Sequence, residues 1–169
     1  MLNLKNITLI CVATKDVEAS YKALKYSSKD INFEKIMFLS NSEDPKDKDI
    51  DHIKIKPFKS VADWGKFIVF DLHKYIDTDF IILIHSDGFI VNPKSWKDNF
   101  LEYDFIGAPF PIPKNNKTYS DYKGNIIRVG NSVSLRSKKI LQLPSELKLS
   151  WTKYDPNYLH EDGYLSVHI

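Results

Sequence analysis

The chain has 169 residues, 43% of them hydrophobic and 27% charged, which fits one folded domain spanning residues 1–169. Its net charge of +2, from 24 basic and 22 acidic residues, argues against a nucleic-acid or polyanion binder. The single cysteine, Cys11, excludes an internal disulfide and a cysteine-based zinc site. No apolar run reaches the ~20 residues that cross a bilayer. The N-terminus also lacks the order of a signal peptide, so we expect a cytoplasmic protein.

Strands and helices alternate in the first half of the chain. The apolar, β-branched run Ile7–Ala13 predicts a strand buried on both faces, as in parallel sheets. Apolar residues at helical spacing predict a helix over residues 16–28. Two further strands are predicted at Ile36–Leu39 and Ile53–Lys56, with a charged loop over residues 41–51 between them.

The middle of the chain contains the strongest strand signal. Ser60 and Asp63 resemble a capping box at the start of a helix whose buried stripe reaches Tyr75. The apolar run Phe80–Ile84 then predicts a strand that leads directly into His85-Ser86-Asp87-Gly88. The remaining expected elements are a helix starting near Pro93, a strand over residues 105–109, short strands at 126–129 and 133–135, and a helix from Ser137 to Leu141.

This order of elements predicts an α/β fold with a mostly parallel sheet. In such sheets, ligands bind beyond the carboxyl ends of the strands. The loops that follow Ala13, Leu39, Ile84 and Ile106 are therefore the candidate binding loops.

His85 and Asp87 follow the strongest predicted strand and should lie at that edge. A carboxylate two residues after an imidazole can hold a hard divalent ion that bridges diphosphate oxygens. The alternative is an ordinary Asp-Gly turn, with His85 hydrogen-bonded in the core.

Glu161 and Asp162 form an acidic pair near the end of the chain. One of two adjacent acids can act as a general base if it is desolvated. The alternative is that both acids stabilise the first turn of a helix through its dipole.

The polar segment over residues 111–124 predicts a long loop. With Tyr119 and Tyr122 it could close over a ligand and exclude water. The alternative is a mobile insertion without such a role.

Several segments, in the same order, make the sequence similar to one family. From about Ser60 to Asp162 it resembles small bacterial and viral glycosyltransferase-like proteins of the GT-A type, long described as a domain of unknown function. The segments that carry the resemblance are Leu72–Asp79, His85–Pro93, Trp96, Phe100–Phe110, Val129–Lys139 and His160–Asp162.

The resemblance implies a GT-A fold, in which a Rossmann-like sheet binds a nucleotide-sugar, usually with Mn²⁺ (or Mg²⁺). His85-Ser86-Asp87 matches the position of an Asp-x-Asp-type metal motif, with Asp87 as the retained carboxylate and His85 beside it. His168 is the candidate for a further metal ligand. Glu161 and Asp162 match the acidic pair that supplies the catalytic base in inverting enzymes, and we assign the base to Asp162.

The remaining expected contacts follow from the resemblance and from the position of ligands at the sheet edge. The uracil and ribose should lie at the end of the first strand. The expected nucleotide contacts are Val12, Ala13, Thr14, Ser40, Asn41 and Ser86. The expected contacts to the donor or acceptor sugar are Gly107, Asn131 and Ser132.

The sequence departs from the family pattern at three places. The family usually has Gln at the position of His85 and Gly-Gly at Ser132-Val133. Relatives also continue beyond the acidic pair, so we expect a minimal or C-terminally truncated domain.

The main hypothesis is a metal-dependent, inverting glycosyltransferase that transfers a hexose from a UDP-sugar to a hydroxyl of a glycan or similar acceptor. One alternative is a degenerate GT-A domain that binds nucleotide or glycan without turnover. A third hypothesis is a flavodoxin-like regulatory domain.

Overall fold

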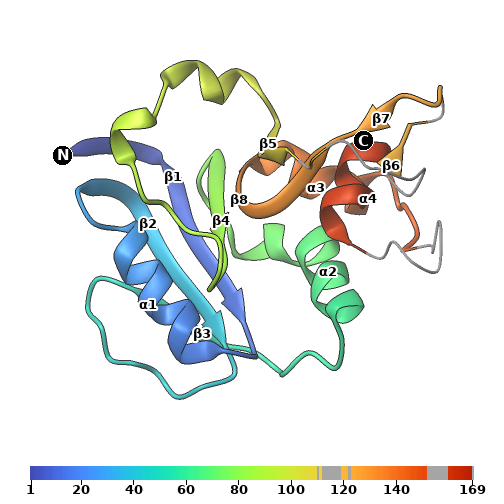
Figure 1. Cartoon of the computed structure of the whole chain (residues 1–169). Coiled ribbons are helices and arrows are strands. Elements are labelled where there is room, and N and C mark those ends of the chain that lie inside the picture. Colours follow the sequence, from blue (N-terminus) through green and yellow to red (C-terminus); the bar gives the residue numbers. More distant parts are fainter. Residues whose placement is uncertain (110, 112–118, 122, 152–159, 169) are drawn as a thin grey trace.

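The computed structural model describes residues 1–109, 111, 119–121, 123–151 and 160–168. Its centre is a six-stranded sheet in the order β3-β2-β1-β4-β8-β5 (Figure 1). The strands of this sheet are β1 (Leu2–Ala13), β2 (Ile31–Ser40), β3 (Asp51–Lys54), β4 (Phe80–Ile84), β5 (Phe105–Pro109) and β8 (Val129–Ser137). A separate two-stranded sheet consists of β6 (Tyr119–Ser120) and β7 (Ile126–Ile127).

The helices lie between and after these strands. The α-helices are α1 (Val17–Ser27), α2 (Val61–Phe70), α3 (Lys138–Glu146) and α4 (Glu161–His168). The 3₁₀ helices are η1 (Leu72–Tyr75), η2 (Pro93–Ser95) and η3 (Asp98–Glu102). Within the described ranges, no helix combines the length and the apolar character that a membrane span requires.

Strand direction divides the sheet into two parts. Strands β3, β2, β1 and β4 run parallel, whereas β8 lies antiparallel between β4 and β5. The prediction of an α/β fold with a mostly parallel sheet is confirmed. The flavodoxin-like alternative is wrong, because that fold has a different strand order, 2-1-3-4-5.

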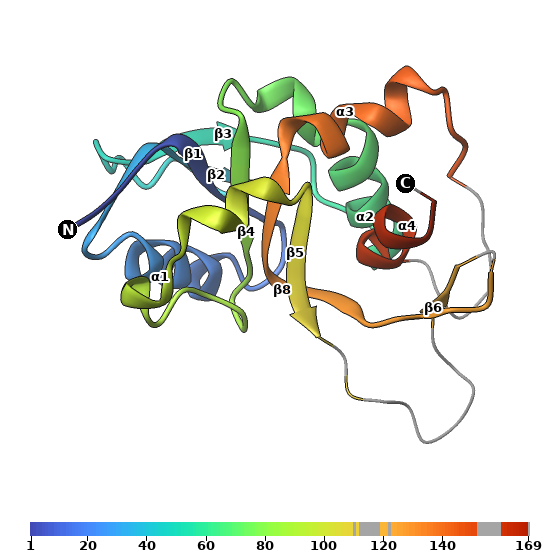
Figure 2. The same cartoon turned by 90° about the horizontal axis from the view of Figure 1, so that it is seen from above.

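Both faces of the sheet are covered. In β1, Leu9 and Cys11 pack into the core on the side of α1, whereas Ile10 and Val12 pack into the core on the side of α2. Figure 2 shows α1 and the η2–η3 segment on one face, and α2, α3 and α4 on the other. A strand buried on both faces needs apolar residues at every position, which explains the continuous apolar run in β1.

Several elements begin or end differently from the prediction, β2, β3 and α3 among them, and two of them show why. Strand β1 begins at Leu2 rather than Ile7, because its first residues pair with the start of β2, where Leu2 lies opposite Ile31. The helix predicted to reach Tyr75 ends at Phe70, and η1 continues the buried stripe in a tighter conformation. In both cases contacts with distant residues decide where the element ends.

The sequence predicts strands at 126–129 and 133–135, whereas the structure has the short β7 and one long strand, β8. A large bulge interrupts the pairing of β8 with β5. Strand β5 advances by two residues from Ile106 to Ala108. Along the same stretch β8 advances by five, from Leu135 to Gly130. The extra residues bend the strand, and Ser132 among them has a left-handed φ of 75°. Bulges of this kind re-aim side chains, and this one lies next to the candidate site.

Gly107 allows β5 to lie directly against β8. A Cβ atom at this position would be 2.2 Å from the carbonyl oxygen of Gly130. We expect Gly107→Ala to lower the free energy of unfolding by about 3 kcal/mol, measured by urea denaturation.

The matched control is Gly124→Ala. A Cβ at Gly124 would meet nothing within 4 Å, and only the left-handed φ of 82° opposes the substitution. It should cost about 1 kcal/mol. A loss in Gly107→Ala no larger than in this control would contradict the close approach of the two strands.

Candidate active site

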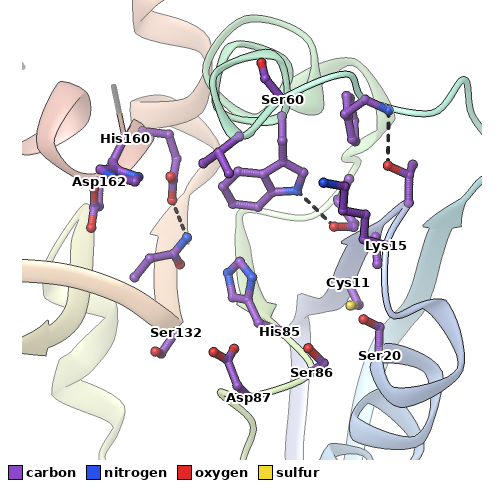
Figure 3. Close-up of a pocket in the computed structure, with 18 residues that line it drawn as sticks. Cys11, Lys15, Ser20, Ser60, His85, Ser86, Asp87, Ser132, His160 and Asp162 are labelled. Carbon is purple, nitrogen blue, oxygen red and sulfur yellow. Dashed lines mark hydrogen bonds between the residues drawn. The ribbon is translucent and has the colours of Figure 1, made fainter. Parts of the chain in front are cut away.

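A cavity of about 370 Å³ lies beyond the carboxyl ends of β1 and β4 (Figure 3). Its walls come from the start of α1, the start of α2, the turn after β4, the bulge of β8 and the start of α4. Ligands of open α/β sheets bind at this edge, where the strand order changes direction. The cavity is therefore the candidate active site.

The segment that leads into α2 covers the end of β1. Thr14 Oγ1 accepts a hydrogen bond from the backbone N–H of Phe58 at 3.1 Å. The indole N–H of Trp64 donates to the carbonyl of Val12 at 2.9 Å. Two polar atoms at the end of β1 therefore already have hydrogen-bond partners. This wall can contact a ligand mainly through its shape and its apolar surface. Lys15, exposed at the rim, provides a positive charge beside it.

The turn after β4 places a carboxylate and an imidazole in the cavity. It is closed by two backbone hydrogen bonds between His85 and Gly88, of 2.8 and 3.4 Å. Asp87 is exposed, while the ring of His85 packs 5.2 Å from the ring of Trp64. His85 Nε2 is buried and makes no hydrogen bond of good geometry among the described residues, although the side chain of Asn131 interacts with the imidazole. Burial lowers the pKa of His85, so the imidazole is neutral at pH 7.

Strand β8 connects the sheet to α4 through a buried ion pair. Arg136 and Glu161 are 0% and 2% exposed, and Arg136 Nη2 lies 2.8 Å from Glu161 Oε1. The amide of Asn131 donates to the same carboxylate, and its oxygen accepts from Arg136 at 3.3 Å. Arg136 also donates to Ser134 Oγ and packs over the ring of Phe105. Both charges therefore have hydrogen-bond partners, as a buried pair requires, although Arg136 Nη1 is buried without one among the described residues.

Asp162 lies next to this ion pair in the first turn of α4. It is 4% exposed, and its carboxylate accepts a hydrogen bond from the N–H of Gly163 at 2.7 Å. Burial raises the pKa of Asp162, and the charge of Glu161 raises it further. A buried carboxylate with a raised pKa is a better proton acceptor than an exposed one.

Most of the site residues expected from the sequence line this one cavity. They come from four separate elements, which only the folded sheet brings together. The expected residues that line it are Val12, Ala13, Thr14, His85, Ser86, Asp87, Asn131, Ser132, Glu161 and Asp162.

The structure does not bring the other expected residues into the lining. Ser40 is fully buried, and its hydroxyl bonds to Ser42 and His52. Asn41 follows it, on the far side of β1 from β4, and Gly107 packs against β8. These positions follow from the strand order, which places β2 and β5 away from the switch between β1 and β4.

Some expectations concern positions outside the described part of the chain. His168 ends α4, but its side chain is not described, so its role as a metal ligand stays a prediction. Tyr122 and the side chain of Tyr119, expected to close over the donor, are also outside the described part.

Several cavity residues were missed by sequence analysis. Phe58 and Ser60 precede α2, Trp64 lies in its first turn, and His160 precedes α4. Ser60 was identified only as a helix cap, a role that the structure confirms because its hydroxyl accepts from Asp63 N–H. Strand β3, which precedes α2, runs parallel to β1 and ends at the ligand-binding edge of the sheet. The cap could therefore have indicated a helix that starts beside the ligand.

Cys11 also lies at the cavity wall, and its chemistry is restricted by burial. It is 1% exposed, and burial raises the pKa of its thiol to about 12. The thiol therefore stays protonated at neutral pH and is not a nucleophile.

Residues 48–169 match a family described as "Protein of unknown function (DUF5672)". The chain belongs to this family. A comparison with curated proteins finds no match.

The structure of this DUF5672 chain is similar to several solved structures. One is 4-diphosphocytidyl-2C-methyl-D-erythritolsynthase from Anaerococcus prevotii DSM 20548, with a TM-score of 0.50 and 11% identity over 90% of this chain and 81% of that one. At this identity the likeness shows the fold alone. Together with the sheet order, it confirms the GT-A fold class expected from the sequence.

Two glycosyltransferases are similar at lower TM-scores. The apo-form glycosyltransferase GlyE of Streptococcus pneumoniae TIGR4 has a TM-score of 0.45 and 14% identity over 94% of this chain and 41% of that one. A glycosyltransferase involved in the glycosylation of the major capsid of PBCV-1 has a TM-score of 0.43 and 12% identity over 95% of this chain and 74% of that one.

The ion pair of this DUF5672 protein gives a test of how α4 is held. Arg136→Met leaves the Glu161 charge buried without its partner, and we expect the free energy of unfolding to fall by about 3–5 kcal/mol. The double variant Arg136→Met/Glu161→Gln should lose clearly less than the two single losses added together. Urea denaturation of all four proteins measures the coupling.

Lys22→Met is the matched control for the loss of a cation. Lys22 pairs with Glu18 on the surface of α1, with side chains 72% and 83% exposed. Its removal should change stability by at most about 0.5 kcal/mol. If Arg136→Met costs as little as this control, the ion pair does not hold α4.

Proposed function

We propose that the chain is a glycosyltransferase that transfers a hexose from a UDP-sugar to a hydroxyl acceptor, with inversion and with the help of Mn²⁺ or Mg²⁺. One observation supports this best: besides the ion-paired Glu161, a single cavity at the ligand-binding edge of the sheet contains two carboxylates in different surroundings. Asp87 is exposed at the end of a buried strand, and Asp162 is buried at the start of a helix. The first suits a charged ligand, and the second suits proton transfer.

The donor's diphosphate lies beside Asp87 in this proposal. The exposed carboxylate and the unpaired Nε2 of His85 are both donor types that divalent ions accept. No group of three metal-binding side chains occurs among the described residues, so diphosphate oxygens would complete the coordination. When bound, such an ion neutralises charge that develops on the leaving diphosphate.

The nucleoside occupies the opposite side of the cavity, at the end of β1. There the side chain of Trp64 and the backbone of Val12 and Ala13 form a wall whose polar atoms are partly paired already. Lys15 at the rim is placed to attract the negative charge of the nucleotide. Figure 3 shows Lys15 and Asp162 on opposite sides of the cavity, which leaves the sugar between the nucleotide and the base.

Asp162 accepts the proton of the attacking hydroxyl. Its raised pKa strengthens it as a base. Glu161 cannot share this task, because Arg136 and Asn131 already bind its carboxylate. Glu161 instead positions the first turn of α4.

Nucleotide binding should depend on metal through Asp87. We expect Asp87→Ala to lower the Mn²⁺-dependent gain in UDP affinity at least ~10-fold, because it removes the carboxylate ligand. Calorimetry with UDP, with and without Mn²⁺, measures this gain. GDP and CMP in the same titrations test the preference for uracil.

Asp77→Ala is the matched control. Asp77 pairs with Lys35 beyond the other end of β4, and its side chain is 83% exposed. Its removal should leave UDP binding unchanged. An Asp87→Ala protein that is folded and keeps the full Mn²⁺-dependent gain contradicts the metal assignment.

Asp162→Asn keeps the shape of the side chain and removes the proton acceptor. Turnover should fall by about 10²–10⁴-fold, with UDP affinity nearly unchanged. Transfer assays with single-turnover kinetics measure both. Transfer at the parent rate, or a product that retains the donor's anomeric configuration, would show that the base is elsewhere. A parent that binds UDP but transfers no sugar supports the alternative, a domain that binds nucleotide without turnover.

The stability of Asp162→Asn separates catalysis from folding. The pKa of Asp162 in the folded protein is raised above its ordinary value of 3.8. The carboxyl group therefore contributes to the stability of the fold below pH 3.8, and this contribution is lost as the pH rises through the pKa of the folded state. At pH 7 the buried charge costs stability, and Asn removes that cost. The variant should therefore be more stable than the parent at pH 7, and the difference should shrink as pH falls toward 3.8.

A further inference from the structure

Ser132 has a backbone conformation that favours glycine. It lies in the bulge of β8 with a φ of 75°, in the left-handed region. A side chain is unfavourable there because Cβ approaches the backbone too closely. Nothing in the hydrogen bonding of the described residues requires a serine at this position.

Contact with the turn after β4 explains why the chain bends at Ser132. A Cβ atom on Gly88 would lie 2.6 Å from the Cβ of Ser132 and 2.7 Å from its Cα. The two backbones therefore touch, and the turn that carries Asp87 rests on the bulge. The bend also directs the side chain of Ser132 toward the cavity, where Figure 3 shows it beside Asp87.

The hydroxyl of Ser132 is exposed in the cavity and makes no hydrogen bond with any residue in the described ranges. Glycine would relieve the backbone strain and would keep every described hydrogen bond. A strained residue with an unused polar group, at a cavity wall, indicates that the group serves a ligand.

We propose that Ser132 is a specificity-determining residue that hydrogen-bonds a hydroxyl of the donor's hexose. This inference rests on the proposed function. The place of the hydroxyl indicates a contact with the hexose rather than with the nucleoside. Ser132 lies on the Asp162 side of the cavity, across from the end of β1 where the nucleoside would bind. The diphosphate is held at Asp87, so the sugar is the next group within reach of Ser132.

Two substitutions at this position separate the hydroxyl from the strain. Ser132→Ala removes the hydroxyl and keeps the strain, whereas Ser132→Gly removes both. Each should lower the affinity for the preferred UDP-hexose about 2- to 10-fold, the effect of one neutral hydrogen bond. Affinity for UDP itself should not change in either variant. Calorimetry of UDP, UDP-glucose and UDP-galactose with Mn²⁺ measures this difference.

Thermal unfolding without ligand tests the strain independently of any activity. Ser132→Gly should raise the melting temperature by about 2–4 °C, and Ser132→Ala should not raise it. The matched control is Asp30→Gly. Asp30 also has a left-handed φ, 59°, but lies in the turn before β2, at the other end of the sheet. It should show the same stabilisation with unchanged binding of every nucleotide.

The outcomes distinguish this inference from the proposed function. If the parent binds no uridine nucleotide, the proposed function is overturned, and the inference with it. If UDP binds but Ser132→Ala binds UDP-hexoses as tightly as the parent, only the inference is overturned. An equal loss for UDP and UDP-hexose places the hydroxyl at the diphosphate and refutes contact with the sugar. If Ser132→Gly does not gain stability, the strain argument is wrong.

Discussion

The buried ion pair between Arg136 and Glu161 is the interaction on which the site depends. Two charges with 0% and 2% exposure have lost their hydration, and only well-directed hydrogen bonds offset that cost. Apolar residues such as Tyr164 and Leu165 bury α4 in the core, but hydrophobic contact has no direction. The ion pair does have direction, and it joins the first turn of α4 to β8. It therefore determines where Asp162 lies relative to the sheet.

The cavity contains several features that cost stability. Asp162 carries a charge in a buried position, Ser132 has a left-handed backbone, and His85 Nε2 is buried without a described partner. Residues that serve ligand chemistry often lower stability, which explains why these features lie together at one cavity. Away from the cavity, the core positions of the parallel strands are mainly buried apolar side chains.

Two parts of the sheet meet at the cavity and contribute different chemistry. In the proposed function, the parallel part, through the ends of β1 and β4, provides a wall for the nucleoside and an exposed carboxylate for the diphosphate. In the proposed function, the antiparallel β8 and the helix α4 provide the base, Asp162, and the hydroxyl of Ser132. The bulge of β8 is the junction, because it supports the turn after β4 and binds the start of α4 at once. In the proposed function, donor binding and proton transfer are thus linked through one short segment.

The sequence by itself determined the strand–helix order and the residues at the ends of the strands. Apolar runs such as Phe80–Ile84 identify buried strands, and the strand-end rule then places His85 and Asp87 at the ligand edge. Only the tertiary structure decided that Ser40 lies outside the cavity and that Trp64 lies in it. Strand order and the partners of a bulge are set by contacts between residues distant in the chain. Local periodicity does not contain that information, since it reports which face of an element is buried and not what packs against it.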